Sequence, residues 1–430
     1  MKRFAVPLLA AVVVVALVLG GCTAQAPTEP TAPTTPSTPT TPTTPTTPSE
    51  PTEPAAELTA KDIPELAELV SKGMLDGDLL MNPFGEDFAV KPDGTPFRFA
   101  ASYICLANDW MVYSDLVTLS LVRRAGAEIN SFDPNFDANK QIAYVEDQVT
   151  VGDVDAMFGS ICDETLLEPT IEWAYDQGVP MFQYDTGTKE SDKIGAFVWH
   201  DFTGPHGTGT LGQKFVEIAE KENRHLYIFE LWGHKGMVTS FERHEGFHSV
   251  VDNYPDLVTV IESADSQYSH EIGANLVADA FQTNPDLNAV FVHGAASAGV
   301  PQGLEAAGKW YPVGHPDHVI CGHTDYDVVL MDWFKDGYVD FLGAHGPWDL
   351  VDAGVKLGFQ NIVLGQSVPR IVDLPMDAFT LEELYTTKMF GAVRAWTEMP
   401  ADCDLWPVLD TTEVGIETPT KEMRMQLQGY

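Results

Sequence analysis

The sequence predicts an α/β protein of two lobes, each built on a parallel sheet that helices cover on both faces. Short apolar runs suited to buried strands alternate with stretches of helical periodicity, at intervals of roughly 25 to 35 residues. About 370 residues follow a low-complexity N-terminal segment, which is more than one core usually holds. Ten strands would make one very wide sheet, so two sheets of about five strands are favoured.

The expected strands are apolar runs bounded by turn residues. In chain order they span residues 97–106, 127–132, 156–161, 180–184, 196–199, 225–231, 257–261, 289–292, 318–321 and 338–342. Helical periodicity lies between them, for example over residues 115–125 and 164–175.

The N-terminus predicts export and lipid attachment. Lys2 and Arg3 precede a short apolar stretch that ends in Leu-Gly-Gly and Cys22. This pattern is typical of a lipoprotein signal peptide over residues 1–21, with Cys22 receiving the lipid. Residues 22–57, nearly all Thr, Pro, Ser, Ala and Glu, cannot build a core and predict an extended linker. We therefore expect a lipid-anchored protein on the outer face of the cell membrane.

The remaining chain is divided by its strand pattern. Residues 58–95 are expected to form an N-terminal extension. The first lobe is expected to span 96–201 and to return at 346–377. The second lobe is expected to span 202–345, together with a tail over 378–430.

Charge and cysteines limit the partners. With 24 basic and 63 acidic residues the chain carries a formal charge of −39, which disfavours nucleic acid and anionic lipid. The cysteine spacing fits no zinc signature. Cys105 and Cys162 close the first and third expected strands, which should be neighbours, so an exported protein could oxidise them to a disulfide.

Polar and aromatic side chains recur directly after the expected strands. Because ligands of such sheets bind beyond the carboxyl ends of the strands, this recurrence predicts a binding site. Rings can stack on the C–H face of a polyol, while carboxylates and amides bind its hydroxyls. These side chains are Asn108, Trp110, Met111, Asp163, Asp185, His200, Asp201, Trp232, Tyr268, His293, Asp325 and His345.

Several of these positions resemble the periplasmic binding protein type I family, in particular its ribose- and galactose-binding group. The likeness covers about residues 97–375, and the segment 241–247, with Glu-Arg-x-x-Gly-Phe, is its most specific motif. The resemblance implies two Rossmann-like lobes joined by a hinge. It also implies that Arg243 and Asp185 hold ligand hydroxyls and that Trp110 and Tyr268 stack on the ligand.

The function implied is that of a solute-binding lipoprotein of an ABC importer, a monomer that binds a sugar-like ligand between its lobes and passes it to permease subunits. We expect no catalytic activity, no cofactor and no bound metal. The predicted ligand-binding residues are Asn108, Trp110, Met111, Asp163, Asp185, Arg243, Tyr268, His293, Asp325 and His345.

The chain departs from the family at two histidines. His293 is followed by Gly294 where sugar binders carry Asn-Asp, and His345 takes a hinge position often held by Gln. Neutral imidazoles could replace these hydroxyl partners, so affinity is expected to weaken between roughly pH 7 and 5, where histidines become charged.

Other motifs offer alternatives. Residues 207–212 read G-x-G-x-x-G and could mark a dinucleotide site, although the turn before them is long. Ser297, Asp325 and His345 occur in the chain order of a hydrolase triad. Residues 244–248 read H-E-x-x-H, a zinc-protease pattern for which no third ligand is identifiable downstream. A sensor that feeds a signalling or chemotaxis receptor would use the same pocket as an import protein.

Overall fold

The structure is a computed structural model that describes residues 58–107, 109–386, 389–400 and 405–429, all within one structural unit. The expected signal peptide, Cys22, the linker, Asn108 and Cys403 lie outside the described residues. No helix among the described residues is both long enough and apolar enough to pass through a membrane.

The first sheet is wholly parallel, with strands in the order β11-β5-β4-β3-β1-β2. Its central strands are buried on both faces, which is why they read as continuous apolar runs rather than as alternating patterns. Its strands are β1 (Arg98–Ser102), β2 (Glu128–Phe132), β3 (Ala156–Gly159), β4 (Met181–Tyr184), β5 (Ala196–Trp199) and β11 (Ile371–Asp373).

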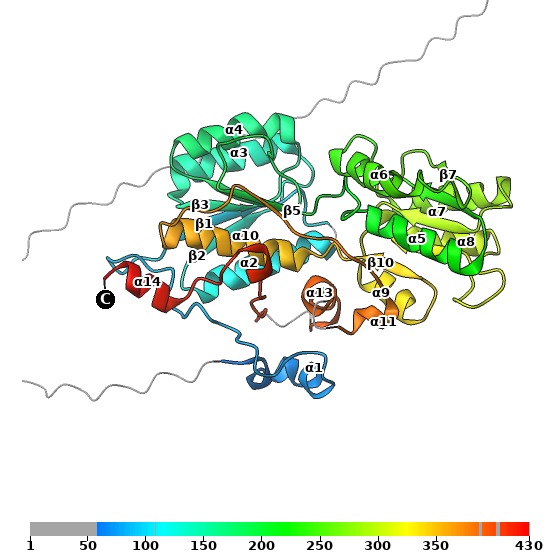
Figure 1. The fold of residues 1–430 in the computed structure, drawn as a ribbon. Helices are drawn as coiled ribbons and strands as arrows, with labels where there is room; N and C mark the ends of the chain where they lie inside the picture. Colours follow the sequence, from blue (N-terminus) through cyan, green and yellow to red (C-terminus); the bar gives the residue numbers. More distant parts are fainter. Residues whose placement is uncertain (1–57, 108, 387–388, 401–404, 430) are drawn as a thin grey trace, which may run out of the picture. The chain divides into compact units, whose positions relative to one another are not determined.

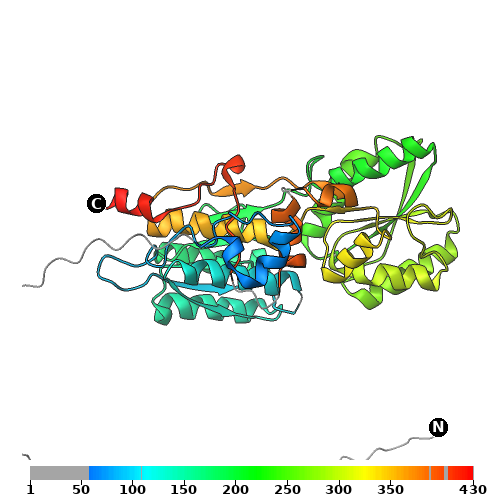
Figure 2. The same ribbon diagram turned by 90° about the horizontal axis from the view of Figure 1, so that it is seen from below.

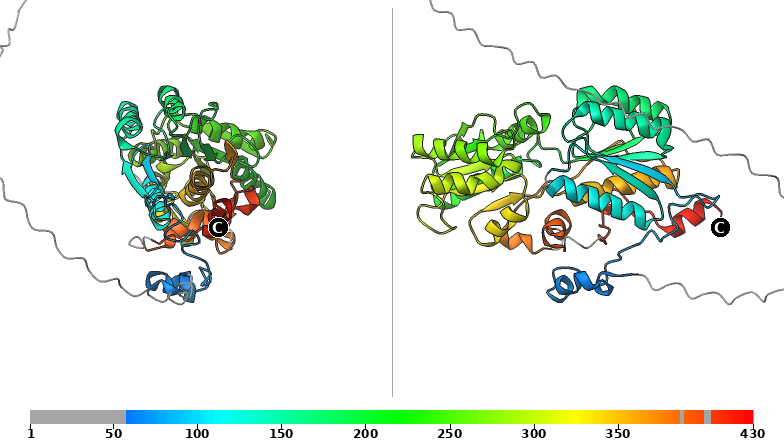
Figure 3. Two further views of the ribbon diagram at one scale, coloured as in Figure 1. Left: turned by 90° about the vertical axis from the view of Figure 1, so that its left-hand side faces the viewer. Right: turned by 180° about the vertical axis from the view of Figure 1, so that it is seen from behind.

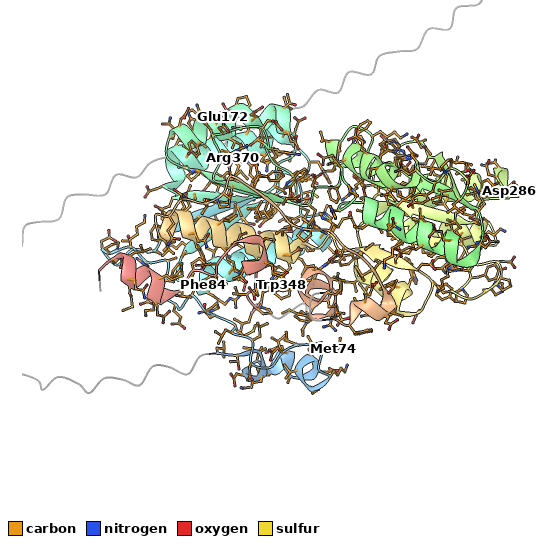
Figure 4. All side chains as sticks on the ribbon, in the orientation of Figure 1. Met74, Phe84, Glu172, Asp286, Trp348 and Arg370 are labelled. Carbon is orange, nitrogen blue, oxygen red and sulfur yellow. The ribbon has the colours of Figure 1, made fainter. Side chains whose placement is uncertain are left out.

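Two pairs of helices cover this sheet, one pair on each face (Figure 1). They are α2 (Asp109–Arg124) with α10 (Pro347–Gly358), and α3 (Ala138–Asp147) with α4 (Glu164–Asp176). The right-hand view of Figure 3 shows α2 running along its face of the sheet. Almost all of α10 is buried, including Trp348, which Figure 4 labels. The helix is therefore a core element.

The second sheet has the order β12-β10-β9-β8-β6-β7, with only β12 antiparallel to its neighbour. Helix α5 packs against α6, and α7 against α8. The strands are β6 (Leu226–Leu231), β7 (Val258–Glu262), β8 (Ala289–Val292), β9 (Ile320–His323), β10 (Phe341–Gly343) and β12 (Ala378–Thr380). The helices are α5 (Gly209–Glu222), α6 (Val238–Val251), α7 (His270–Thr283), α8 (Val300–Ala306) and α9 (Val328–Lys335).

Glycines set how closely α5 and α6 pack. A Cβ on Gly246 would collide with the carbonyl oxygen of Phe202 and the hydroxyl of Thr208, so only glycine fits there. Gly212 of α5 also lies close to α6, where an added Cβ would be 3.0 Å from the carbonyl oxygen of Phe247. The G-x-G-x-x-G motif therefore serves helix packing, and the glycine of the Glu-Arg-x-x-Gly-Phe motif has a steric cause.

Short helical segments complete the fold. They are η1 (Ala60–Asp62), η2 (Pro64–Leu66), α1 (Ala67–Ser71), η3 (Gln148–Gly152), η4 (Ala295–Gly299), η5 (Phe359–Val363), α11 (Leu381–Leu384), η6 (Phe390–Arg394), α13 (Ala395–Glu398), η7 (Thr412–Val414) and α14 (Lys421–Leu427).

The C-terminal tail contacts both lobes. It was expected with the second lobe, and β12 does pair with β10. Residues 405–429 of the tail, however, pack on first-lobe elements, beside α10 in Figure 2. Lys356 of α10 donates to the carbonyl of Leu409 and to Thr411 Oγ1 at 3.1 Å. Another tail residue, Arg394, donates to the carbonyl of Met74 in the N-terminal extension at 2.8 Å.

The suggested disulfide is not formed in the structure. Strands β1 and β3 are neighbours as expected, but Cys162 is a free thiol whose sulfur lies 3.4 Å from the carbonyl oxygen of Ile104. Burial raises the pKa of the Cys162 thiol to about 12, with a smaller contribution from the neighbouring Cys105. Pairing of adjacent strands does not by itself supply the specific geometry that a disulfide requires.

Candidate functional site

A cavity of about 680 Å³ opens at the carboxyl ends of strands from both sheets. This volume falls within the range of small-molecule sites. Seven of the predicted ligand-binding residues line it: Trp110, Met111, Asp185, Arg243, Tyr268, Asp325 and His345. Most of the residues that were predicted from their positions after strands therefore line one cavity.

Arg243, on α6, is the buried cation of the cavity. Its Nη2 donates to Asp325 Oδ1 at 2.9 Å, and its Nη1 donates to the hydroxyl of Tyr268 at 3.2 Å and to the carbonyl of His293. Burial opposes the charge, but the neighbouring Asp325 raises the pKa of Arg243 above its ordinary value. Gly294 has φ +146°, and a Cβ there would strike both Arg243 and Asp325. The glycine that replaces the family's Asp thus makes room for this ion pair.

Asp185 faces the cavity directly after β4. Its backbone has φ +68°, a left-handed conformation that is uncommon for a residue other than glycine. The amide of Asp185 donates to the carbonyl of Val198 at 3.1 Å, which holds this turn. Burial raises the pKa of Asp185 to about 6, although Arg243 and His200 act in the opposite direction. A left-handed backbone that carries a carboxyl group with a raised pKa is typical of a ligand site.

His345 lies where the chain passes from β10 to α10. Its Nδ1 is 2.8 Å from Nδ1 of His200, which follows β5 at another crossing between the lobes. Its Nε2 lies 3.4 Å from Asp185 Oδ1. Burial lowers the pKa of His345 to about 3, so the imidazole stays neutral between pH 7 and 5. The expectation that this histidine becomes charged in that interval is therefore wrong.

Two aromatic rings reach the cavity from different lobes. Trp110 of α2 stacks on His345, and its indole Nε1 donates to the carbonyl of His345 at 3.4 Å. Tyr268 and its neighbour Gln267 both have left-handed backbones, with φ +55° and +54°. The Tyr268 hydroxyl lies 2.7 Å from Ser240 Oγ, which fixes the ring. That these rings enclose a ligand stays a prediction.

Two predicted ligand residues do not line the cavity. Asp163 caps the start of α4, where its carboxylate accepts the amide of Leu166 at 2.9 Å. The buried His293 turns to Glu230, with Nε2 2.7 Å from Oε1, and only its carbonyl reaches Arg243. Both residues follow a strand, but the side chain of Asp163 caps a helix and that of His293 hydrogen-bonds to a buried glutamate.

The cavity also contains residues that sequence reasoning did not single out. Trp396 comes from the tail, and Tyr326 follows Asp325 on the same loop; their rings contact each other with centroids 5.3 Å apart. Tyr326 could have been found as the neighbour of a strand-end residue. No sequence signal places Trp396 there, because the path of the tail depends on tertiary packing.

The hydrolase alternative does not match the geometry. Ser297 Oγ donates to the carbonyl of Gly294 at 2.6 Å, and Asp325 is engaged by Arg243. The ring of His345 faces His200 and Asp185 instead. These three side chains therefore do not form the serine–histidine–carboxylate chain that nucleophilic attack requires.

Two α/β lobes with a cavity lined from both sheets define a ligand-binding protein of the two-lobe class. Residues 107–366 match the family model of the periplasmic binding protein domain, and the chain belongs to this family. The predicted fold and the predicted class of solute-binding protein are thereby confirmed.

Two curated relatives are import binding proteins. The chain is 29% identical over 281 residues to the ribose import binding protein of Bacillus subtilis, covering 65% of this chain and 86% of that protein. It is 24% identical over 233 residues to the D-apiose import binding protein of Actinobacillus succinogenes, covering 54% of this chain and 71% of that protein.

Solved structures share the fold. An ABC transporter periplasmic solute-binding protein of Actinobacillus succinogenes with bound D-allose has a TM-score of 0.58 at 16% identity, covering 67% of this chain and 98% of the other. A solute-binding protein of Bacillus halodurans with bound myo-inositol has a TM-score of 0.58 at 20% identity, covering 68% and 97%.

Proposed function

We propose that this protein binds a monosaccharide or a similar polyol in the cavity and delivers it to an ABC importer. The observation that carries the proposal is the convergence of a buried cation, a carboxylate and two rings on one cavity of small-molecule size. Relatives named for the import of ribose and D-apiose, and neighbours with bound D-allose and myo-inositol, support the same ligand class.

Each side chain has a role in this proposal. At neutral pH the ionised Asp185 accepts hydrogen bonds from ligand hydroxyls. Arg243 donates to ligand oxygens from a position that Asp325 and Tyr268 already hold, so little conformational entropy is lost on binding. Trp110 and Tyr268 stack on the apolar C–H faces of the ring. Binding and release involve no covalent step.

The chain crossings between the lobes supply the conformational response. His200 and His345 lie in separate crossings and contact each other directly. A ligand that contacts both lobes binds the closed arrangement more tightly than the open one and so shifts the population toward it. The permease then recognises the closed arrangement. Lipid attachment at Cys22 and the linker over 22–57 would hold this domain at the outer face of the cell membrane.

A thermal-shift screen of the purified domain tests the proposal. D-Ribose, D-allose, D-arabinose and myo-inositol are added singly, and a ligand of the native state raises the melting temperature. We expect at least one sugar to do so for the wild type and not for Arg243→Ala, while Glu172→Gln, distant from the cavity on α4, retains the shift. No shift with any sugar or polyol, or conversion of the added sugar to product, would refute the proposal.

A further inference from the structure

A group of histidines surrounds a buried glutamate outside the ligand cavity. Glu230, at the end of β6, is fully buried. His244 Nδ1 lies 3.0 and 3.2 Å from its two carboxylate oxygens, and His248 Nε2 lies 3.2 Å from Oε2. His244 and His248 are one turn apart on α6, so both rings point to the same side of the helix.

From this arrangement we propose that Glu230, His244 and His248 form a binding site for a divalent transition-metal ion such as Zn²⁺. The three ligand atoms lie within 4.8 Å of one another. Zinc bonds of about 2.0 Å in a tetrahedron separate neighbouring ligand atoms by roughly 3.3 Å. The observed 3.0 to 3.2 Å between nitrogen and oxygen is close to that edge, so an ion could replace the protons shared between the imidazoles and the carboxylate.

The second layer of contacts has the form of a metal site. His248 Nδ1 donates to Asp252 Oδ1 at 2.8 Å, which leaves Nε2 directed at Glu230. A carboxylate that orients a histidine in this way is the usual support of a ligating imidazole. His293 donates from Nε2 to Glu230 Oε1 at 2.7 Å and so fixes the carboxylate from its other side.

An ion can reach the site from solvent through its two histidines. The carboxylate of Glu230 is itself fully buried, within hydrogen-bond distance of the imidazoles of His244, His248 and His293. The side chains of His244 and His248 are 25% and 20% exposed, which gives an ion a path from solvent.

This site differs from the zinc-protease pattern in its third ligand. The sequence motif is H-E-x-x-H, and its spacing identifies no third ligand downstream. Glu230 precedes the motif instead, on the neighbouring strand, and the motif's own Glu245 is exposed. Two imidazoles and a carboxylate suit Zn²⁺, whereas Ca²⁺ and Mg²⁺ prefer oxygen ligands only. The site is therefore assigned to ion binding without catalysis.

Metal titration of the chelator-treated domain tests the assignment. We expect about one equivalent of Zn²⁺ to bind saturably by calorimetry, and Co²⁺ to give the visible absorption of a low-coordinate site. His244→Gln and His248→Gln should each weaken Zn²⁺ binding at least about 100-fold. Asp252→Ala, at an exposed position, should weaken it about 10- to 100-fold through the orientation of His248.

Controls separate this site from the acidic surface. His318→Gln removes another imidazole that contacts a carboxylate, Nε2 to Asp340 Oδ2 at 2.9 Å, and should leave Zn²⁺ affinity unchanged. Circular dichroism verifies that each variant is folded. If no saturable Zn²⁺ binding occurs, if it persists in both histidine variants, or if Ca²⁺ binds equally well, the assignment is wrong and the cluster is only a hydrogen-bonded pairing of the buried glutamate.

Discussion

The indole of Trp110 stacks on the imidazole of His345, with ring centroids 5.3 Å apart and ring planes 21° apart. One ring belongs to a first-lobe helix and the other to a crossing between the lobes. One face of the indole is therefore already covered, and a ligand would stack on the other. This contact links the occupancy of the cavity to the residue at the crossing.

Replacing Trp110 with alanine should weaken sugar binding by about 2 kcal/mol, or roughly 30-fold, because the stacking surface is lost. Calorimetry with the best sugar of the thermal-shift screen measures the change. Trp173→Ala is the control, since Trp173 is also half-buried in the first lobe but lies on α4, outside the cavity. Unchanged affinity in Trp110→Ala would remove the indole from the site.

Replacing Arg243 with lysine should lower affinity by roughly 100-fold, although the charge is kept. The ammonium cannot reproduce the two-nitrogen contact with Asp325, Tyr268 and the carbonyl of His293. Arg224→Lys changes a half-buried arginine outside the cavity that pairs with Glu222, and this variant should bind normally. Equal affinities for the two variants would contradict the role of the guanidinium.

Sugar affinity should fall as the pH decreases through about 6, the raised pKa of Asp185. Ligand hydroxyls donate to the ionised carboxylate, and its ionised fraction falls about tenfold between pH 7 and 5, so the dissociation constant should rise by about that factor. His345, with a pKa near 3, should add nothing in this interval. Asp185→Asn should bind weakly and without pH dependence, and a wild-type constant that is flat from pH 7 to 5 would rule out this mechanism.

The same carboxylate should also make stability depend on pH. A pKa that is raised in the folded state contributes stability at low pH, and this contribution is lost as the pH rises through 6. Relative to Asp185→Asn, the wild type should therefore gain about 1 kcal/mol of unfolding free energy between pH 7 and 5. Urea unfolding of both proteins at the two pH values measures it, and a gain in the opposite direction would mean that Asp185 is not destabilised by burial.

The buried pair of Lys356 and Asp352 should hold the tail on α10. Its atoms are 2.7 Å apart and both side chains are fully buried; Lys356 also donates to Leu409 and Thr411. Lys356→Met should cost about 3–5 kcal/mol of unfolding free energy, because it leaves a buried carboxylate unpaired. Lys193→Met, which breaks an exposed pair with Asp176, should cost less than about 1 kcal/mol. Similar losses in urea unfolding would show that burial does not matter here.

Cys22→Ser should release the protein from the membrane fraction of cells that express the full chain. Serine lacks the thiol to which the proposed lipid would be attached, so the variant would lose this anchor. Immunoblots of membrane and soluble fractions measure the distribution. A variant that remains with the membrane would mean that another part of the chain attaches it.

The fold could be predicted where strands are buried and long enough to show a pattern. The expected strands at 196–199 and 289–292 coincide with β5 and β8. Strands β11 and β12 were missed because each consists of two apolar residues and one polar residue, too short a run to establish a period. Their pairing depends on neighbours that come from elsewhere in the chain.

The site could be predicted to the level of strand ends but not to the direction of side chains. Asp185 and Asp163 both follow a strand, yet one faces the cavity and the other caps a helix. His293 turns away because Glu230, a buried acid on the next strand, offers it a stronger partner. Trp396 reaches the cavity through a tail whose path no local pattern encodes.

The tail has a mechanical consequence for the two lobes. Beyond the crossings at His200 and His345, the chain crosses again between β11 and β12 and then returns to α10 through Lys356. Extra crossings resist twisting and sliding of the lobes against each other but still permit rotation about a common hinge axis. The lobes would therefore move relative to each other along a narrower range of directions than lobes joined by fewer segments.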